Sequence, residues 1–314
     1  MKGWFFHGTG QPLQMREVAD PTPAADEVLL AVGGAGLCHT DVGVLEDPGW
    51  MSMLPHLPII IGHEVAGTVL AVGAGVTAWQ VGDRVGVCPT TAAGAPGFSY
   101  NGGFADKMIA PAGALVPIPD TVGFAAGASA TDAGMTSYHA MMTTGALQAG
   151  MKVGVIGLGG LGQIGARVAA LSGAEVYVAE IDTTVWHLAE ALGAAATASS
   201  IRDFVNTELD LIVDYAGFGT TTAEAVETVR NGGRVVQVGM GKLEATISTK
   251  AMILNQVTLV GSNGGTPADI EAVYALLASG ALSPVCSEIG FEDIPDGLEK
   301  LSKGEVTGRL VALF

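Results

Sequence analysis

Two short segments near the N-terminus carry side chains of the types that bind metal ions. Cys38-His39-Thr40-Asp41 follows a glycine-rich break, and Gly62-His63-Glu64 follows the apolar run Ile59-Ile60-Ile61. Thiolate and imidazole are both zinc ligands. A single cysteine is more often a small buried apolar residue, and a single histidine is often a hydrogen-bonded structural residue. Taken alone, these residues leave a metal site and an ordinary core open as equal alternatives.

A second segment has the residue types and order of a dinucleotide-binding unit. The apolar run 153–156 predicts a buried strand, and it leads into Gly157-Leu158-Gly159-Gly160-Leu161-Gly162. In such a motif the first glycine makes a tight turn, the second lets the backbone approach a pyrophosphate, and the third lets helix and strand pack closely. An Ala-rich helix that stops at Gly173 and a second strand at 175–179 complete the unit.

Glu180 ends this second strand and can accept hydrogen bonds from the adenosine ribose hydroxyls. The pyrophosphate would lie at the N-terminus of the helix, where unpaired N–H groups and the helix dipole favour an anion. A carboxylate disfavours a 2′-phosphate, and no Arg or Lys follows within the next few residues. The segment therefore predicts NAD rather than NADP. The alternative is a glycine-rich turn in some other α/β domain.

Composition limits the class of protein. The chain has 314 residues, with 14 Lys and Arg against 31 Asp and Glu, and a formal charge of -17. Such an acidic surface argues against nucleic acid and anionic membranes as partners. The N-terminal residues do not have the pattern of a signal peptide, and the apolar run 153–173 contains Gln163 and Arg167. Three cysteines make no disulfide framework, so we expect a cytoplasmic protein with reduced thiols.

Two kinds of segment must position these residues. Residues 1 to about 120 have short apolar runs broken by Gly and Pro, which predict an all-β region. From Phe124 onward the pattern changes to helical spacing and then to alternating strands and helices, which predicts a parallel sheet. The tail predicts two helices and a last strand at 308–313. We therefore predict an α/β protein in which a β-rich domain, 1–123 and 262–314, is interrupted by a nucleotide-binding domain, 124–261.

Five motifs together resemble those of the zinc-dependent medium-chain alcohol dehydrogenases. They occur in the family's order and spacing over nearly the whole chain. These motifs are Cys38-His39-Thr40-Asp41, Gly62-His63-Glu64-Val65-Ala66-Gly67, Gly82-Asp83-Arg84-Val85, Gly157-Leu158-Gly159-Gly160-Leu161-Gly162 and Gly308-Arg309. The resemblance implies a GroES-like catalytic domain, a Rossmann domain with a doubly wound parallel sheet, and an NAD-dependent alcohol dehydrogenase or ketone reductase.

The resemblance also implies a catalytic zinc held by Cys38, His63 and a third ligand. Many members carry Cys where this chain has Asp132, and Asp is similar to the secondary-alcohol branch of the family. Carboxylate oxygen is an accepted zinc ligand, and three protein ligands leave an open fourth position. Glu64 matches a carboxylate that approaches the zinc when water or product exchanges. Asp41 is expected to accept from the other ring nitrogen of His63.

Such a zinc would polarise a carbonyl or lower the pKa of a bound alcohol, and NAD would carry the hydride. Thr40 resembles the family's relay hydroxyl, which takes the alcohol proton. Several members continue the relay with a His at the position that Gly43 occupies here, so the proton is expected to leave by another route. Val185 replaces a Lys that many NAD-dependent members place near the adenosine ribose.

The residues expected to contact the cofactor include His39 and Arg309 at the pyrophosphate and Thr136 near the nicotinamide. For the two cations, an ordinary surface position is the alternative. The full expected set is His39, Thr136, Gly157, Gly159, Gly160, Leu161, Gly162, Glu180, Val238, Gly239 and Arg309.

A loop with four closely spaced Cys binds a second, structural zinc in many members. Here Cys88 is alone in the segment 88–103, so we expect one zinc per chain, held by Cys38, His63 and Asp132 with Glu64 nearby. Candidate walls of the substrate pocket are Leu45, Trp50, Met51, Met53, Leu54 and Phe98. They suggest a roomy apolar pocket, although core or subunit contacts explain them equally well.

Three functional hypotheses remain from the sequence. The first is a zinc- and NAD-dependent alcohol dehydrogenase acting on a secondary, aryl or medium-chain alcohol, as a homodimer or homotetramer. The second is a zinc-independent quinone or enone reductase on the same fold, which the retained Cys38, His63 and Asp132 disfavour. The third is a non-catalytic NAD-binding protein, which the retained Thr40 disfavours.

Overall fold

The structure is a computed structural model that describes residues 1–314. Its chain forms two compact units, which are described separately. Unit 1 comprises Met1–Ala133 and Thr266–Phe314, and unit 2 comprises Gly134–Gly265. The sequence placed the two boundaries at 123/124 and 261/262, so both boundaries of the compact units lie later in the chain. Asp132 consequently belongs to the same unit as Cys38 and His63.

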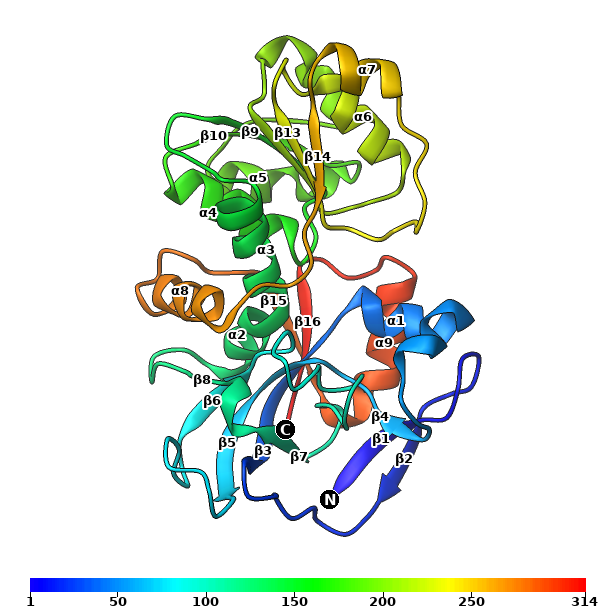
Figure 1. Cartoon of the computed structure of the whole chain (residues 1–314), viewed down its shortest axis with the longest axis vertical. Helices are drawn as coiled ribbons and strands as arrows, with labels where there is room; N and C mark the ends of the chain where they lie inside the picture. The colour runs from blue at the N-terminus through cyan, green and yellow to red at the C-terminus, as the bar shows by residue number, and fades with distance from the viewer. The chain divides into compact units, whose positions relative to one another are not determined.

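Unit 1 is built on two β-sheets (Figure 1). The smaller sheet has the order β2-β1-β4, formed by β1 (Lys2–Phe6), β2 (Gln14–Glu17) and β4 (Ile59–Ile60). The larger has the order β15-β16-β3-β5-β6-β8, and β7 pairs with β3 outside this path. Its strands are β3 (Glu27–Leu37), β5 (Glu64–Val72), β6 (Arg84–Val87), β7 (Lys107–Pro111), β8 (Leu115–Pro117), β15 (Cys286–Gly290) and β16 (Arg309–Leu313).

The first half of β3 alternates half-buried and buried residues, as expected for a strand with one face in the core. Its second half is buried throughout, because β5 and β16 pair with it on both sides. Phe6, Leu30 and Phe104 are fully buried in the resulting core. This frame holds the end of β3, and therefore Cys38, in a fixed place.

The prediction of an all-β region up to residue 120 is wrong at one important place. Helix α1 (His39–Glu46) begins directly after Cys38 and is followed by a 3₁₀ turn, Pro48–Met53. The helix starts where it does because the Asp41 carboxylate accepts a hydrogen bond from the Cys38 N–H, 3.0 Å away. Helix α9 (Ile294–Ser302) packs against α1. The Cys38 segment therefore leads from strand β3 into a helix, with Cys38 at the N-cap position.

A second helical segment leads to Asp132. Helix α2 (Phe124–Ser129) packs against β3, β5 and β16 and continues as a π-helical turn, Ala130–Gly134. Such π turns are rare and occur often at functional sites. Further along, α8 (Pro267–Ala278) contacts β8. No helix of the structure combines the length and the apolar character that crossing a membrane requires.

Unit 2 is a parallel six-stranded sheet with the order β11-β10-β9-β12-β13-β14. Helices α4 and α5 lie on one face and α6 and α7 on the other (Figure 1). The strands are β9 (Lys152–Ile156), β10 (Glu175–Ala179), β11 (Ala194–Ala198), β12 (Leu211–Asp214), β13 (Arg234–Gln237) and β14 (Thr258–Gly261). The helices are α3 (Met135–His139), α4 (Gly162–Leu171), α5 (Trp186–Leu192), α6 (Thr220–Thr228) and α7 (Thr249–Leu254).

This strand order is that of the Rossmann fold, and it confirms the predicted fold class. The order reverses between β9 and β12, so the carboxyl ends of β9, β10 and β12 surround the crevice where such sheets bind ligands. Gly157 and Glu180 follow β9 and β10 directly and therefore lie at this edge.

Candidate active site

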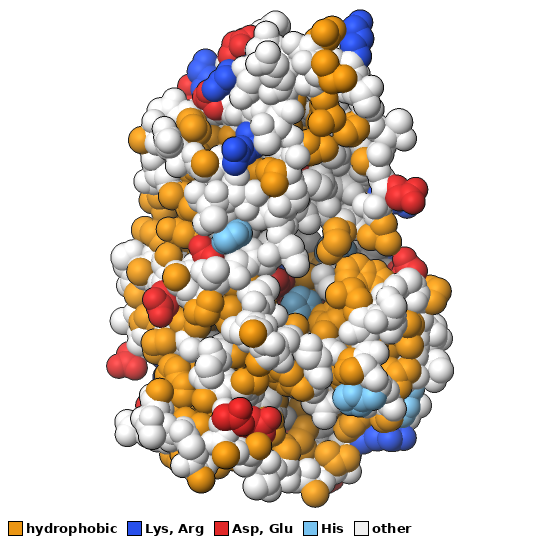
Figure 2. Space-filling view, viewed as in Figure 1, with side chains coloured by type: hydrophobic (Ala, Val, Ile, Leu, Met, Phe, Trp, Pro, Cys, Tyr) orange, Lys and Arg blue, Asp and Glu red, His pale blue; other side chains and the backbone are white.

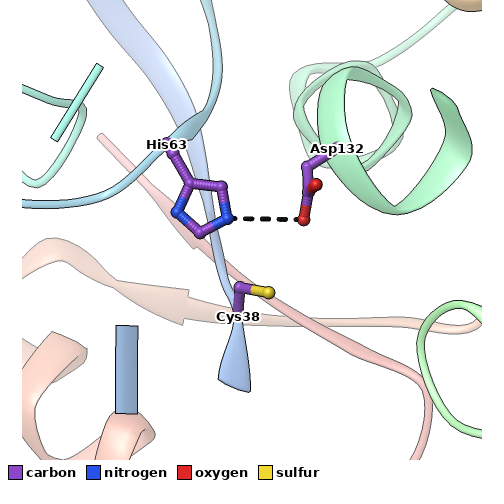
Figure 3. Close-up of side chains that lie close together, drawn as sticks. All are labelled: Cys38, His63 and Asp132. Atoms are coloured by element: carbon purple, nitrogen blue, oxygen red, sulfur yellow. Dashed lines mark ion pairs between the residues drawn. The ribbon is translucent and has the colours of Figure 1, made fainter. Parts of the chain in front are cut away.

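Three side chains from separate elements of unit 1 converge on one point (Figure 3). Cys38 lies between β3 and α1, His63 lies just before β5, and Asp132 lies in the π-helical turn after α2. Their ligand atoms all lie within 4.8 Å of one another. This is the only group of three or more His, Cys, Asp and Glu residues in the structure that is arranged to hold a metal ion.

Hydrogen bonds fix the orientation of these ligands. His63 Nδ1 lies 3.2 Å from Asp41 Oδ1, which leaves Nε2 facing Asp132 Oδ2 at 3.4 Å. Asp41, expected to orient His63, is fully buried and also accepts from the Cys38 N–H. One carboxylate therefore orients two of the three ligands. Phe98 contacts the imidazole in a T-shaped arrangement, with 5.7 Å between the ring centroids.

The donor set fits zinc. Thiolate, imidazole and carboxylate are its three common protein ligands, and a carboxylate hydrogen-bonded to the ligating histidine is its usual support. Burial alone would lower the pKa of His63, but Asp41 and Asp132 outweigh it and raise the pKa well above its ordinary value. Burial would raise the pKa of Asp132, but His63 and Arg309 hold it below its usual range. The pocket is thus arranged for a positive charge between these groups.

Glu64 and Arg309 form a buried ion pair beside the three ligands. Arg309 Nε donates to Glu64 Oε2 at 2.7 Å, and Nη2 donates to Asp132 Oδ2 at 2.9 Å. Glu64 Oε1 accepts from the Ala133 N–H at 3.0 Å. Gly36 leaves room for this carboxylate, because an added Cβ there would lie 1.6 Å from Glu64 Oε2. Burial raises the pKa of Glu64 to about 7, against the opposing effect of Arg309.

Arg309 is only 4% exposed, so the alternative of an ordinary surface cation does not describe it. Burial lowers the pKa of His39, and the nearby Arg309 guanidinium lowers it further. The two residues expected at the pyrophosphate, His39 and Arg309, therefore lie close to each other within unit 1. Their contact with a cofactor stays a prediction.

The glycine motif of unit 2 has the geometry that the sequence predicts. Gly157 has φ +85°, which a residue with a side chain rarely adopts. A Cβ added at Gly159 would meet no atom within 4 Å, so the backbone is open to a ligand there. A Cβ at Gly162, the first residue of α4, would lie 1.8 Å from Gly157 O. Glycine is required at this third position because the first residue of α4 lies directly against the turn that follows β9.

Glu180 stands at the expected place but has partners of its own. Its Oε2 accepts from the Leu158 N–H at 2.7 Å, and its Oε1 accepts from the Asp182 N–H at 2.8 Å. Each carboxylate oxygen keeps a further lone pair for a ribose hydroxyl. Glu180 also lines a cavity of about 160 Å³ at this edge of the sheet. The motif, the carboxylate and the cavity together fit an adenosine diphosphate moiety.

Known proteins are similar to this chain over nearly its whole length. Residues 24–120 match the alcohol dehydrogenase GroES-like domain, and residues 160–279 match the zinc-binding dehydrogenase domain. An alcohol dehydrogenase from Geobacillus stearothermophilus is 32% identical over 96% of this chain and 96% of its own. The chain belongs to the zinc-dependent medium-chain alcohol dehydrogenase family. This chain is a zinc- and NAD-dependent oxidoreductase.

Two solved structures show how closely the fold follows this family. An alcohol dehydrogenase from Aeropyrum pernix has a TM-score of 0.91 at 28% identity and covers 100% of both chains. Acetophenone reductase from Geotrichum candidum, solved in complex with NAD, has a TM-score of 0.90 at 29% identity and covers 100% of this chain and 97% of its own.

The other family positions are distributed over both units. In unit 1, Thr40 Oγ1 lies 3.6 Å from Cys38 Sγ. In unit 2, Thr136 is buried, and the N–H groups of Val238 and Gly239 donate to Asp214 O at 3.0 and 2.9 Å. Val238 and Gly239 therefore lie at the same sheet edge as the glycine motif. The cofactor contacts of Thr136, Val238 and Gly239 stay predictions. The same holds for Gly160 and Leu161.

The candidate walls of the substrate pocket lie in three different environments. Phe98 packs on His63 beside the ligand atoms. Leu45, Trp50, Met51 and Leu54 are partly buried against the core of unit 1, whereas Met53 is exposed. Phe98 is therefore the candidate wall that the structure places directly at the metal ligands.

Sequence reasoning missed a buried carboxylate in unit 2. Asp214, the last residue of β12, accepts from the N–H groups of Ala216 and Gly217 at 3.0 and 2.8 Å. It also accepts from the hydroxyls of Thr221 and Thr222. Asp214 thus fixes the loop after β12, which lines the adenosine cavity. An Asp that ends a strand before Gly and a run of Thr is the signal that was available.

Proposed function

We propose that this alcohol dehydrogenase interconverts secondary alcohols and ketones of aryl or medium-chain type, with NAD(H) as the cofactor. The observation that carries the proposal is the convergence of Cys38, His63 and Asp132 within 4.8 Å. Asp132 as the third ligand, in place of a second thiolate, supports the secondary-alcohol branch. The apolar ring of Phe98 beside His63, at 5.7 Å between ring centroids, supports an aryl or alkyl group next to the reacting carbon. The likeness to an acetophenone reductase points in the same direction.

Bound zinc supplies Lewis acidity at the substrate oxygen, and bound NAD supplies a hydride acceptor. The chain's own residues orient the zinc ligands and transfer the proton. Asp41 holds His63 so that Nε2 faces the site. Arg309 holds the Asp132 and Glu64 carboxylates apart in a fixed arrangement. Thr40, whose Oγ1 lies 3.6 Å from Cys38 Sγ, takes the alcohol proton and passes it on.

In unit 2, the α4 N-terminus and the open backbone at Gly159 bind the pyrophosphate. Glu180 binds the adenosine ribose, and we assign Val238, Gly239 and Thr136 to the nicotinamide half. Glu180 lines its cavity without an Arg or Lys beside it, which supports NAD over NADP.

Zinc-independent quinone or enone reduction on the same fold is the competing activity. It gives no reason for a buried Asp41 that orients His63, or for an Arg309 that neutralises Asp132. A panel of ketones, aldehydes and enones assayed with NADH separates the two activities. We expect reduction of ketones that stops when a chelator removes zinc. Enone reduction that survives the chelator would refute the proposal.

A homo-oligomer, either dimer or tetramer, is the expected assembly. Strand β14 ends the sheet of unit 2 with an unpaired edge, and such an edge is a template for pairing with another chain. Ile253 and Leu254, on the helix before it, are 72% and 68% exposed, and apolar surface lies over this end of unit 2 (Figure 2). Sedimentation of the protein and of Leu254→Glu tests this assembly. None of the three cysteines is in a disulfide, which supports a reducing, cytoplasmic location.

A further inference from the structure

The cavity of unit 2 has a direction. It lies at the carboxyl ends of β9, β10 and β11, which are neighbours in the sheet. Gly157 follows β9, Glu180 follows β10, and Ser199 and Ser200 follow β11. A dinucleotide with its pyrophosphate at Gly157 and its ribose at Glu180 therefore directs its base toward Ser199 and Ser200.

Two apolar side chains mark the walls for a flat ligand. Ile181 is 83% exposed and Phe218 is 54% exposed, and both line the cavity. Exposed large apolar side chains that line a cavity indicate a surface that a ligand covers. A purine ring lying against them would present its edge to the polar groups at the far end of the cavity.

One of these polar groups is charged and has no assigned role. Glu224, on α6, lines the cavity, and its Oε2 accepts from the Ser200 hydroxyl at 2.9 Å. Its Oε1 lies 3.4 Å from Arg202 Nε, so this oxygen is weakly engaged. Glu227, one turn further along α6, binds the same Arg202 at 2.7 Å but does not line the cavity. Glu224 is therefore a hydrogen-bond acceptor that Ser200 holds in place, at the end of the cavity where the base would lie.

We propose that Glu224 reads the purine base of the cofactor by accepting a hydrogen bond from the exocyclic amino group of adenine. Adenine presents an N–H donor at C6, whereas hypoxanthine presents a carbonyl oxygen at the same position. A carboxylate accepts from the first and repels the second. Glu224 is thus a specificity-determining residue for the base, separate from Glu180, which binds the ribose. The proposal rests on the placement of NAD in unit 2 described above.

The test uses the zinc-loaded, full-length protein and a binding measurement without turnover. NADH and reduced nicotinamide hypoxanthine dinucleotide share the same fluorescent nicotinamide, so one titration gives the Kd of each. We expect NADH to bind about 10-fold tighter, as one charge-assisted hydrogen bond at a partly exposed site would produce. Glu224→Gln should bring this ratio close to one by tightening the hypoxanthine dinucleotide, because an amide both accepts and donates.

Two further variants separate the possible causes. Glu224→Ala should bring the ratio close to one by weakening NADH instead. Glu227→Gln, which removes the other carboxylate on Arg202, should keep the wild-type ratio. Equal affinity of the wild type for the two dinucleotides would overturn the proposal, as would a ratio that Glu224→Gln leaves unchanged or that Glu227→Gln abolishes equally. Failure of NADH itself to bind would instead refute the NAD site, and the base reading with it.

Discussion

The indole nitrogen of Trp50 lies 2.9 Å from the point where a Cβ on Gly43 would stand. The indole nitrogens of Trp4, Trp79 and Trp186 each donate to a backbone carbonyl, but that of Trp50 has no partner in the chain. Gly43 is three residues after Thr40 on α1, so the Trp50 ring and the Thr40 hydroxyl share one face of this helix. The space of the family's relay histidine is thus occupied by an aromatic ring.

Introducing the relay histidine should therefore harm the enzyme. Gly43→His requires the Trp50 ring to move, and overpacking of this kind typically costs about 1 to 3 kcal/mol of stability. We expect kcat to fall about 10-fold, because the displaced Trp50 ring shares a helix face with Thr40. A 10-fold fall corresponds to about 1.4 kcal/mol in the activation free energy. Adding Trp50→Ala should recover much of the loss, because the pair then has room. Steady-state kinetics and denaturant unfolding of both variants measure this coupling. A single Gly43→His variant with wild-type kcat and stability would contradict the contact.

Metal analysis should find one zinc per chain. The three ligands of the only group arranged to hold a metal ion are Cys38, His63 and Asp132, and no such group of three or more His, Cys, Asp and Glu residues includes Cys88. Chelation should abolish activity and leave the fold largely intact, because both sheets of unit 1 are held by other contacts. The unfolding temperature should fall when zinc is removed, because one bound ion stabilises the folded state. Elemental analysis after dialysis gives the stoichiometry.

The matched control for this prediction is a second cysteine. Cys38→Ser should reduce zinc content below 0.5 per chain, which is roughly the loss expected when one of three ligands is removed. Cys88→Ser should leave it unchanged. Two zinc ions per chain, or equal loss from both variants, would show that the loop 88–103 holds metal.

Local sequence patterns predicted the Rossmann unit well because its signals are local. The run 153–156, the glycine motif and Glu180 all lie within 30 residues and were placed correctly. Strand β11 was missed because Ala194-Ala195-Ala196-Thr197-Ala198 lacks the β-branched and aromatic residues that mark strands. It forms because β10 offers it a parallel edge. Tertiary pairing overrode weak local propensity here.

The site was predictable only in part for a similar reason. Cys38, His63 and Asp132 were found through family motifs, and no local pattern shows that they meet. Glu224 and Ser200 belong to no motif and come together only through the order of strands in the sheet. Arg309 was expected at a phosphate, but its pairing with Glu64, which is 245 residues away in the sequence, follows from the β16–β3–β5 pairing.

Thr40→Val should lose most turnover while keeping zinc and NADH binding. The change removes a hydroxyl and little volume, and a general acid–base group typically contributes about 10² to 10⁴-fold. Thr40→Ser retains the hydroxyl and should keep activity within about 10-fold. The measurements are kcat across pH 6 to 10, roughly the range over which relay protons exchange, together with zinc content and NADH affinity. Turnover of Thr40→Val within a factor of about two of wild type at every pH would remove this hydroxyl from the proton path.

Arg309→Met should destabilise unit 1 more than any exposed ion-pair variant. Arg309 is 4% exposed and Glu64 is fully buried, so the change leaves a buried carboxylate without its cation. Breaking a buried pair in this way typically costs about 3 to 5 kcal/mol. Arg202→Met is the matched control, because its partners Glu224 and Glu227 are partly exposed and the loss should stay below about 1 kcal/mol. The double variant Arg309→Met with Glu64→Gln should be less destabilised than Arg309→Met alone, since no buried charge then lacks a partner at that position. Urea unfolding of the zinc-free and zinc-loaded forms gives these differences. A double variant no more stable than the single one would show that Arg309 acts through Asp132 and the zinc ligands instead of through Glu64.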